Sequence, residues 1–509
     1  MKNAPVPRTG PRTGRIFGRA LPPAVFALAL AVGSAAGAQE DGSAGSDISY
    51  SNQLQIWVVD STRAASYLDA FDIQGTHGPW LIQARFELDE EDRTDPQRSL
   101  GIVRRFAEYH DETATLRGGT YYASFGRGLL LRAEEDATVR LDRDIDGFYG
   151  ALHWKALDGQ LLVGRPRNDK TYQRDDLIAG SELTVRATPE LSLGGGYVRR
   201  DAAMGLGAGN ASVDSSLGRP VEELAGGHAR WTHGLAEAYV EYAKRYVWGR
   251  YDPALGWIGL SGRDGRAVYG SLTLGVPGYT ALIEGKDYLG FDAPYSTLPP
   301  ANAAGMPTNN GRDDRGFGIS FTASPREDFT LDAAASHADA RDDDGWRSSA
   351  EGRVRKDWWG RGSLQVGGEW NEEIGMTEVT GFPYRKYAGP GLNASYYFGA
   401  ERTLALHSKL LAREDREPYV KYTEVSADLT FSLSPSQAIT ASLIRTTEPL
   451  PHYEHEDTWA SLEYHWTITV QHEVKIKAGR ERGGIVCSGG VCHYEPPFSG
   501  VRIEFLSRL

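Results

Sequence analysis

The two cysteines of the chain lie close together near its C-terminus, where they could form a disulfide. Cys487 and Cys492 flank a segment that contains Gly489 and Gly490, and these glycines permit a tight loop. In the oxidising compartment that an exported chain enters, such a pair becomes a disulfide. The two thiols and His493 leave a zinc site incomplete, and their spacing is not that of a Cys-x-x-Cys redox motif. We therefore expect a disulfide that closes the last outer loop.

Two other segments contain residue types that bind metal ions, but each lacks the rest of a site. Residues 142–147, Asp-Arg-Asp-Ile-Asp-Gly, match the first half of a calcium loop, yet the twelfth position is His153 rather than a bidentate Glu. The His- and Glu-rich cluster at 452–457 falls in a loop between expected strands, where a solvated polar tip is the simpler interpretation. No nucleophile elbow, phosphate-binding glycine loop or His-Glu-x-x-His motif occurs. We expect no metal, no cofactor and no enzymatic activity, although barrel enzymes can assemble sites from separate strands.

Charged residues also recur at alternate positions in segments whose other positions are apolar. Both signs of charge occur among them, so they assign no ion preference. The simpler interpretation is that they solvate an inner wall and pair across strands, and the alternative is a selective charged path through a pore. The candidates for lining the lumen are Arg186, Glu237, Glu241, Glu351, Arg353, Arg355, Glu369, Lys475 and Lys477.

The segments that carry these residues have the period of two that is typical of β-strands. Val425, Ala427, Leu429, Phe431 and Leu433, for example, alternate with polar residues. Because successive side chains of a strand point to opposite faces, each such segment has one apolar face and one wetter face.

The connections between these segments decide between a soluble sandwich and a membrane barrel. Tight turns such as 157–159 and 276–278 alternate along the chain with long loops such as 201–220 and 290–313. Short periplasmic turns and long outer loops are typical of a transmembrane barrel, whereas a sandwich has no reason to sort its loops. The sequence predicts an all-β fold, a transmembrane antiparallel up-and-down β-barrel of about 24 strands, within a range of about 22 to 26.

The N-terminal residues 1–38 have the pattern of a secretory signal peptide. Residues 2–19 are basic, an apolar core follows at 20–32, and Ala36-Gly37-Ala38 provides small residues for cleavage. A retained membrane anchor is the less favoured alternative, because the apolar run is short for a bilayer. We expect residues 39–509 to form the mature barrel. The formal net charge of −13 repels phosphate, so we expect no nucleic-acid partner.

One segment inside the expected barrel breaks the alternation. Residues 125–136 contain three consecutive leucines, and their glycines allow a sharp bend. The simpler interpretation is an extended or bulged strand end on the outer side, and the alternative is a segment that folds inward and narrows the lumen. We expect no globular N-terminal plug, because strands take up most of the residues before Phe148.

Two stretches resemble an uncharacterised family of bacterial outer-membrane barrel proteins. They are residues 121–147, with Phe125-Gly126-Arg127-Gly128-Leu129 followed by Arg132, Glu135-Asp136 and Asp146-Gly147, and the ending from Cys487 to Gly500. The resemblance implies a barrel and no established activity. We expect the barrel to lie in the bacterial outer membrane, in contact with lipid and lipopolysaccharide. We expect a porin-like pore or channel component for solute passage. The alternative is a barrel scaffold that encloses or anchors a partner protein, in its lumen or in the periplasm.

Overall fold

The computed structural model describes most of the chain between Ser46 and Arg508. The expected signal peptide lies outside the described residues, and so does the cluster at 452–457 except for Asp457. The described residues are 46–59, 64–89, 99–139, 141–167, 174, 176–201, 221–248, 250–252, 256–258, 264–291, 293–301, 313–341, 345–358, 360–375, 384–399, 401–416, 419–448, 457–488, 491–495 and 497–508. Within these ranges no helix is long and apolar enough to cross a membrane.

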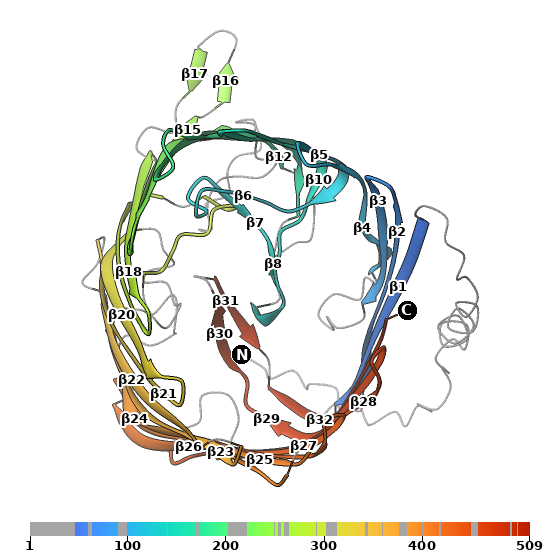
Figure 1. Ribbon diagram of the computed structural model, residues 1–509, viewed down its shortest axis with the longest axis vertical. Coiled ribbons are helices and arrows are strands. Elements are labelled where there is room, and N and C mark those ends of the chain that lie inside the picture. Colours follow the sequence, from blue (N-terminus) through green and yellow to red (C-terminus); the bar gives the residue numbers. More distant parts are fainter. Residues whose placement is uncertain are drawn as a thin grey trace, which may run out of the picture.

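Twenty-four strands form one closed antiparallel barrel (Figure 1), and the predicted strand number is confirmed. Each strand pairs with the next barrel strand along the chain, and the last strand closes the ring on the first, with Val58 opposite Val501. The barrel strands are β1 (Ser46–Val59), β2 (Ala64–His77), β3 (Trp80–Asp89), β4 (Ser99–His110), β5 (Ala114–Tyr121), β10 (Ile145–Trp154), β11 (Leu157–Pro166), β12 (Leu177–Arg186), β13 (Leu191–Asp201), β14 (Val221–His233), β15 (Ala236–Trp248), β18 (Gly265–Val276), β19 (Tyr279–Leu289), β20 (Asp314–Arg326), β21 (Phe329–Ala340), β22 (Trp346–Trp358), β23 (Gly362–Ile374), β24 (Tyr384–Tyr397), β25 (Thr403–Arg416), β26 (Val420–Ser434), β27 (Gln437–Thr446), β28 (Thr458–Thr469), β29 (His472–Glu481) and β32 (Phe498–Arg508).

The two ends of the barrel differ in their connections, as the sequence predicts. At one end, here called the turn end, tight turns contain Gly78, Gly234 and Gly278, whose φ angles of 56°, 56° and 82° favour glycine. At the other end, the loop end, the connections are longer. One of them contains a small hairpin of β16 (Arg250–Asp252) and β17 (Gly256–Ile258). β1 begins and β32 ends at the turn end, because Ser46 lies opposite His77 and Arg508 opposite Ser51.

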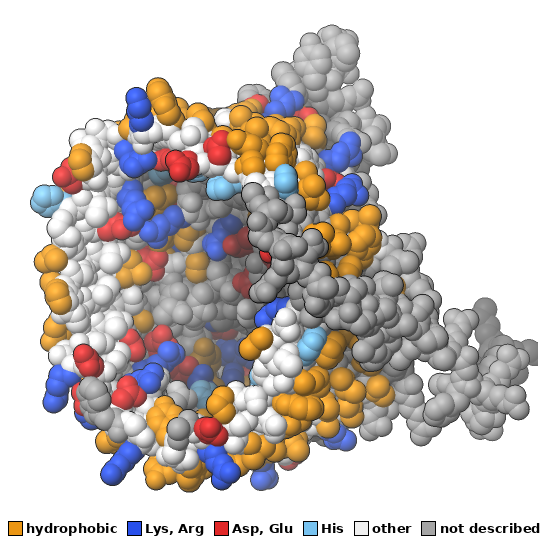
Figure 2. All heavy atoms as spheres, turned by 45° about the vertical axis from the view of Figure 1, so that its right-hand side comes forward, with side chains coloured by type: hydrophobic (Ala, Val, Ile, Leu, Met, Phe, Trp, Pro, Cys, Tyr) orange, Lys and Arg blue, Asp and Glu red, His pale blue; other side chains and the backbone are white. Residues whose placement is uncertain are grey.

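The outer face of the barrel is apolar and carries aromatic residues near both ends. Side chains such as Ile283 and Leu429 stay 44% and 45% exposed, because nothing in the described chain covers them. Figure 2 shows hydrophobic side chains along the outside of the wall and charged side chains inside the hollow. Flanking aromatic bands are typical of outer-membrane barrels. At the turn end the exposed aromatics are Trp80, Trp154, Trp231, Tyr279, Trp358 and Tyr396, and toward the loop end they are Tyr197, Tyr242, Phe317 and Tyr419.

Three segments from the loop end fold into the barrel. The first, residues 122–144, contains β6 (Ala123–Phe125), β7 (Leu131–Ala133), β8 (Glu135–Asp136), the 3-10 helix η1 (Ala137–Val139) and β9 (Leu141–Asp142). We call this segment the shelf. The second is 291–301, and the third is the hairpin of β30 (Gly484–Ser488) and β31 (Val491–Glu495), which contacts η1 (Figure 1). The interpretation of 125–136 as an extended or bulged strand end is therefore wrong, because its leucines turn inward onto the wall.

Candidate functional site

The shelf is held to the inner wall by an apolar core. Phe125, Leu129 and Leu131 are fully buried, and they belong to one cluster with Leu162 and Ile178 from the wall strands. Burying each such side chain contributes about 1.5 to 3 kcal/mol. The neighbouring segment 291–301 adds backbone hydrogen bonds, from the Arg132 amide to the Tyr295 carbonyl (2.7 Å) and from the Thr297 amide to the Gly128 carbonyl (3.1 Å). The shelf is therefore a fixed part of the barrel interior.

Two carboxylates of the wall bind the tight turn at the tip of the shelf. The Gly126 amide donates to Glu182 Oε1 and the Arg127 amide to Glu241 Oε2, both at 2.7 Å. Gly126 has a φ of 56°, and a Cβ at this position would lie 2.6 Å from Glu241 Oε1. Each bond pairs a buried backbone amide with a wall carboxyl group, so the two side chains anchor the turn. Only glycine allows the chain to approach them this closely.

The Arg127 side chain adds a cationic contact to the same anchor. Its guanidinium lies over the ring of Tyr239, 4.6 Å from the centroid, and donates to the Tyr269 hydroxyl at 3.3 Å. The Tyr239 hydroxyl donates in turn to Glu241 at 2.7 Å. A cation over an aromatic ring in a partly desolvated site is attracted by the ring quadrupole. Apolar packing, hydrogen bonds to carboxylates and a cation–aromatic contact therefore all hold the tip of the shelf against the wall.

The structure places all nine predicted lumen residues on the inner face of their strands, but it does not gather them into one site. Glu241 is only 2% exposed, since the shelf covers it, and it anchors the shelf rather than facing water. The others form local pairs: Arg186 with the Lys155 carbonyl (2.7 Å), Glu237 with Arg230 (2.8 Å), Glu351 with Arg353 (2.6 Å), Arg355 with Asp357 (3.0 Å), Glu369 with Lys409 (2.7 Å), Lys475 with Glu473 (3.1 Å) and Lys477 with Glu481 (2.5 Å).

Sequence reasoning did not identify a set of buried ion pairs on the inner wall near the loop end. Glu222 accepts from Arg200 at 2.8 Å and from Arg245 at 2.5 Å, and all three side chains are at most 7% exposed. Lys286 pairs with Asp314 in an equally buried position. The alternation of the strands could have placed these residues on the inner face. Their burial could not be read from it, because it depends on long-range folding of the interior.

Both stretches that suggested a family resemblance lie within a family match. Residues 83–253 and 420–509, together more than half of the 509 residues, match a family described as "Family of unknown function (DUF6029)". The chain belongs to this family. The first matched stretch contains the shelf with Glu182 and Glu241, and the second contains the strands that close the barrel. No curated protein matches the chain.

Solved outer-membrane barrels share a limited similarity with this family member. The siderophore receptor PirA from Acinetobacter baumannii is 8% identical, with 92% of this chain and 81% of that chain covered and a TM-score of 0.44. OccK2 (OpdF) from Pseudomonas aeruginosa, solved in complex with glucuronate, is 11% identical, with 64% and 92% covered and a TM-score of 0.39.

The half calcium loop lies at the end of the shelf, where arginines surround its carboxylates. Arg167 contacts Asp144 at 2.9 Å and Asp142 at 3.1 Å, and Arg105 contacts Asp146 at 3.2 Å. Burial raises the pKa of Asp144, and the Arg167 guanidinium opposes that shift. Among the described residues no group of His, Cys, Asp and Glu side chains could hold a metal ion. Asp142 and Asp144 instead tie the end of the shelf to Arg167, whereas Asp146 on β10 pairs with Arg105 on β4.

The hairpin of β30 and β31 sets Cys487 directly opposite Cys492. Directly opposed residues of an antiparallel pair have Cα atoms about 4.5 to 5.5 Å apart, which is within the range of disulfides. The disulfide itself stays a prediction, since the described residues include the backbone of this hairpin but not these side chains. The hairpin belongs to the last connection at the loop end, and it folds inward against η1.

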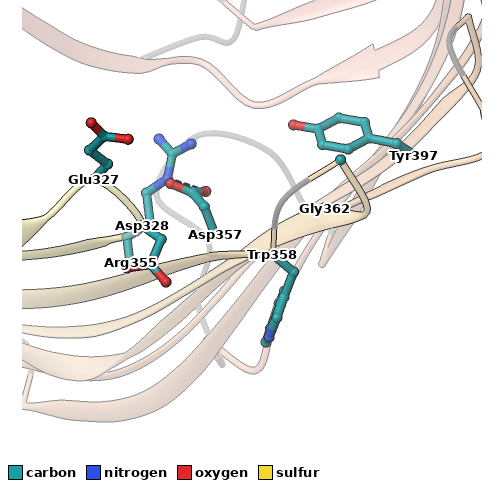
Figure 3. A pocket seen from close by; sticks show the side chains of 8 residues that line it. Glu327, Asp328, Arg355, Asp357, Trp358, Gly362 and Tyr397 are labelled. Atoms are coloured by element: carbon teal, nitrogen blue, oxygen red, sulfur yellow. Dashed lines mark hydrogen bonds and ion pairs between the residues drawn. The ribbon is translucent and has the colours of Figure 1, made fainter.

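A polar cavity of about 300 Å³ lies at the turn end of the wall (Figure 3). Asp357 and Tyr397 lie on one side of the sheet, while Trp358 points to the opposite side and is 48% exposed on the outer face. The pKa of Asp328 is lowered because the Lys356 ammonium donates a hydrogen bond to its carboxylate. The lining is formed by Glu327, Asp328, Arg355, Asp357, Trp358, Gly360, Gly362 and Tyr397.

Proposed function

We propose that the protein is a pore of the bacterial outer membrane that passes small hydrophilic solutes through a lumen narrowed by the shelf. The observation that carries the proposal is the contrast between the two faces of the closed barrel. Its outside is apolar and banded with aromatics, which suits lipid, whereas its inside is lined with paired charges, which suits water. A closed cylinder with these faces conducts water and solutes along its axis unless its interior is blocked.

The shelf argues for a selective passage rather than a wide one. Barrels with more than about 16 strands leave an aqueous channel that side chains cannot fill, so one of this size needs internal segments to restrict it. Here the shelf restricts the lumen, because its buried leucines and two carboxylates of the wall hold it in place inside the barrel. We expect a conductance well below that of an unobstructed barrel of this width.

Planar bilayer recordings test the proposal. The protein, refolded in detergent and checked for a heat-dependent gel shift, should give steady current steps in potassium chloride. A matched variant in which a short Gly-Ser linker replaces residues 123–142 should give larger steps. A folded barrel that stays silent in both forms contradicts a pore.

The scaffold alternative predicts a different result in the same experiments. A barrel that encloses or anchors another protein should co-purify with it and conduct only after the partner is removed. The interior already contains the shelf, the segment 291–301 and the β30–β31 hairpin, which leaves less room for a partner inside the lumen. A stoichiometric partner in protein isolated from native membranes, together with silence in bilayers, supports the scaffold. Fractionation of the native membranes tests the proposed location.

A further inference from the structure

A second cavity lies in the inner wall of β22 to β25, on strands that do not hold the shelf. Its volume is about 250 Å³, which is near the lower limit for small-molecule sites. The described residues that line it include no Phe, Tyr or Trp. They are Glu351, Arg353, Gln365, Gly367, Gly368, Glu369, Gly389, Gly391, Asn393, His407 and Lys409.

The strand register arranges these side chains in three rows across the wall. The middle row runs from Arg353 through Gly367 and Gly391 to Lys409, so two cations flank two glycines. Three interstrand spacings put the Cα atoms of the two cations about 14 Å apart. The row toward the loop end carries Glu351, Glu369 and Gly389, and the row toward the turn end carries Gln365, Asn393 and His407. The floor of the cavity is thus glycine backbone between an acidic side and an amide side.

Of the four glycines that line the cavity, Gly367 and Gly389 are required by the backbone, whereas Gly368 and Gly391 are not. A Cβ at Gly389 would lie 1.7 Å from the Leu410 carbonyl oxygen, and one at Gly367 would lie 2.6 Å from that of Gly352. A Cβ at Gly391 would meet only the Ser408 carbonyl oxygen, at an ordinary 3.7 Å. Glycine weakens a strand, and one use of an inward-facing glycine is to let a ligand approach the backbone.

The charges of the cavity balance, and their heads remain accessible. Glu351 lies directly opposite Glu369, and two like charges in this position are unfavourable unless cations neutralise them. Arg353 contacts Glu351 at 2.6 Å, and Lys409 reaches across Gly391 to contact Glu369 at 2.7 Å. The Arg353 and Lys409 side chains are 50% and 36% exposed. A ligand with a single charge would therefore meet as many repelling charges as attracting charges in the cavity.

We propose that this cavity binds small zwitterions, namely amino acids and short peptides, as they pass through the pore. The inference rests on the proposed function and names its class of solute. The ammonium group of the ligand lies toward Glu351 and Glu369. Its carboxylate lies over Gly391, where Arg353, Lys409 and the amide of Asn393 act as donors. The described lining residues include no Phe, Tyr or Trp on which a sugar ring could stack, and this argues against sugars.

Glycylglycine is the probe for the unaltered protein, with acetate, methylammonium and glucose as controls. Isothermal titration calorimetry in detergent measures binding without requiring conduction, and bilayer recordings measure interruptions of the current. Glycylglycine should bind and interrupt the current with the same concentration dependence, whereas the three controls should do neither. Binding of glycylglycine without any current would contradict the proposed pore but would still support the binding site. Current without glycylglycine binding, or equal binding of acetate or glucose, overturns the zwitterion site alone.

Two variants test the position of the site. Gly391→Leu fills the floor of the cavity and should weaken glycylglycine binding at least about tenfold, because the ligand can no longer reach its polar partners. Gly285→Leu is the matched control on the outer face of β19, where a Cβ meets no atom closer than 4.0 Å, and it should leave binding unchanged. Both should keep the gel shift, which shows that the barrel folds, and Gly285→Leu should also keep the current in potassium chloride. Equal binding by the two variants overturns the assignment.

A charge variant tests the chemistry of the site. Glu369→Gln removes one partner of the ligand ammonium and should weaken glycylglycine binding about tenfold, the effect of losing one hydrogen bond to a charged group. It also frees Lys409 from its carboxylate, so acetate should now bind. A purely structural role for Glu369 would not produce this exchange of specificity. If the variant keeps the preference of the unaltered protein, the proposed orientation of the ligand is wrong.

Discussion

Substitution of Gly126 by alanine should loosen the shelf without unfolding the barrel. Gly126 has a φ of 56°, which costs a residue with a side chain about 1 to 2 kcal/mol. The added Cβ would lie 2.6 Å from Glu241 Oε1, so the carboxylate must move and lose its hydrogen bond from the Arg127 amide. A hydrogen bond to a charged group contributes about 1.5 to 3 kcal/mol. The combined loss of about 2.5 to 5 kcal/mol lowers the free energy of opening the shelf.

Hydrogen exchange followed by mass spectrometry measures this opening directly. Peptides from the shelf should exchange about a hundredfold faster or more in Gly126→Ala, since about 1.4 kcal/mol corresponds to a factor of ten. Peptides from β20 to β29 should be unaffected. Gly234→Ala is a matched control, because Gly234 also has a φ of 56° but a Cβ there meets no atom within 4 Å. If shelf exchange stays unchanged in Gly126→Ala, or if both variants accelerate it equally, the carboxylate anchor is not what holds the turn.

Other perturbations test the shelf core, the disulfide and the lipid-facing side. Leu129→Ala should destabilise the docked shelf by about 2 to 5 kcal/mol, seen as faster exchange of the same peptides, because it leaves a cavity in a fully buried position. Alkylation of the denatured protein should label neither Cys487 nor Cys492 before reduction and both afterwards; labelling without reductant refutes the disulfide. Val366 lies on the outer face and is 49% exposed, and Val366→Arg should lower the free energy of unfolding by about 2 to 4 kcal/mol, measured by urea unfolding from lipid vesicles. Gln365→Arg, its inward neighbour, should cost much less, and equal costs would contradict the assignment of the two faces.

The parts of the fold that depend on neighbouring residues could be predicted from the sequence. Strand alternation has a period of two, and tight turns carry their own glycine signals, so the number of strands and the two kinds of connection follow from local pattern. The inward fold of the shelf does not follow from local pattern, since the residues that anchor it are distant in sequence. Glu182 lies 56 residues from Gly126, and Glu241 lies 114 residues from Arg127. A run of three leucines signals burial, but the sequence does not say against which surface.

The same limit explains why Glu241 was predicted to line the lumen. Alternation correctly places Glu241 on the inner face of β15, but the face alone does not reveal what covers it. A carboxylate on an inner wall can meet water, a neighbouring cation or an inserted segment, and these cases have identical local sequence patterns. In the structure the backbone amides of the shelf tip and the Tyr239 hydroxyl surround it.

Two glycines therefore separate the two roles of the inner wall. Gly126 is favoured by geometry, because its φ and the nearby Glu241 carboxylate make any side chain there costly, and replacing it should change how the shelf moves. Gly391 is free of such demands, because a side chain there would fit against Ser408 and occupy only the cavity. Replacing it should change what the wall binds and leave the shelf unaffected. If both substitutions altered the same property, the shelf and the cavity would form one site rather than two, and the assignment of restriction to one and recognition to the other would fail.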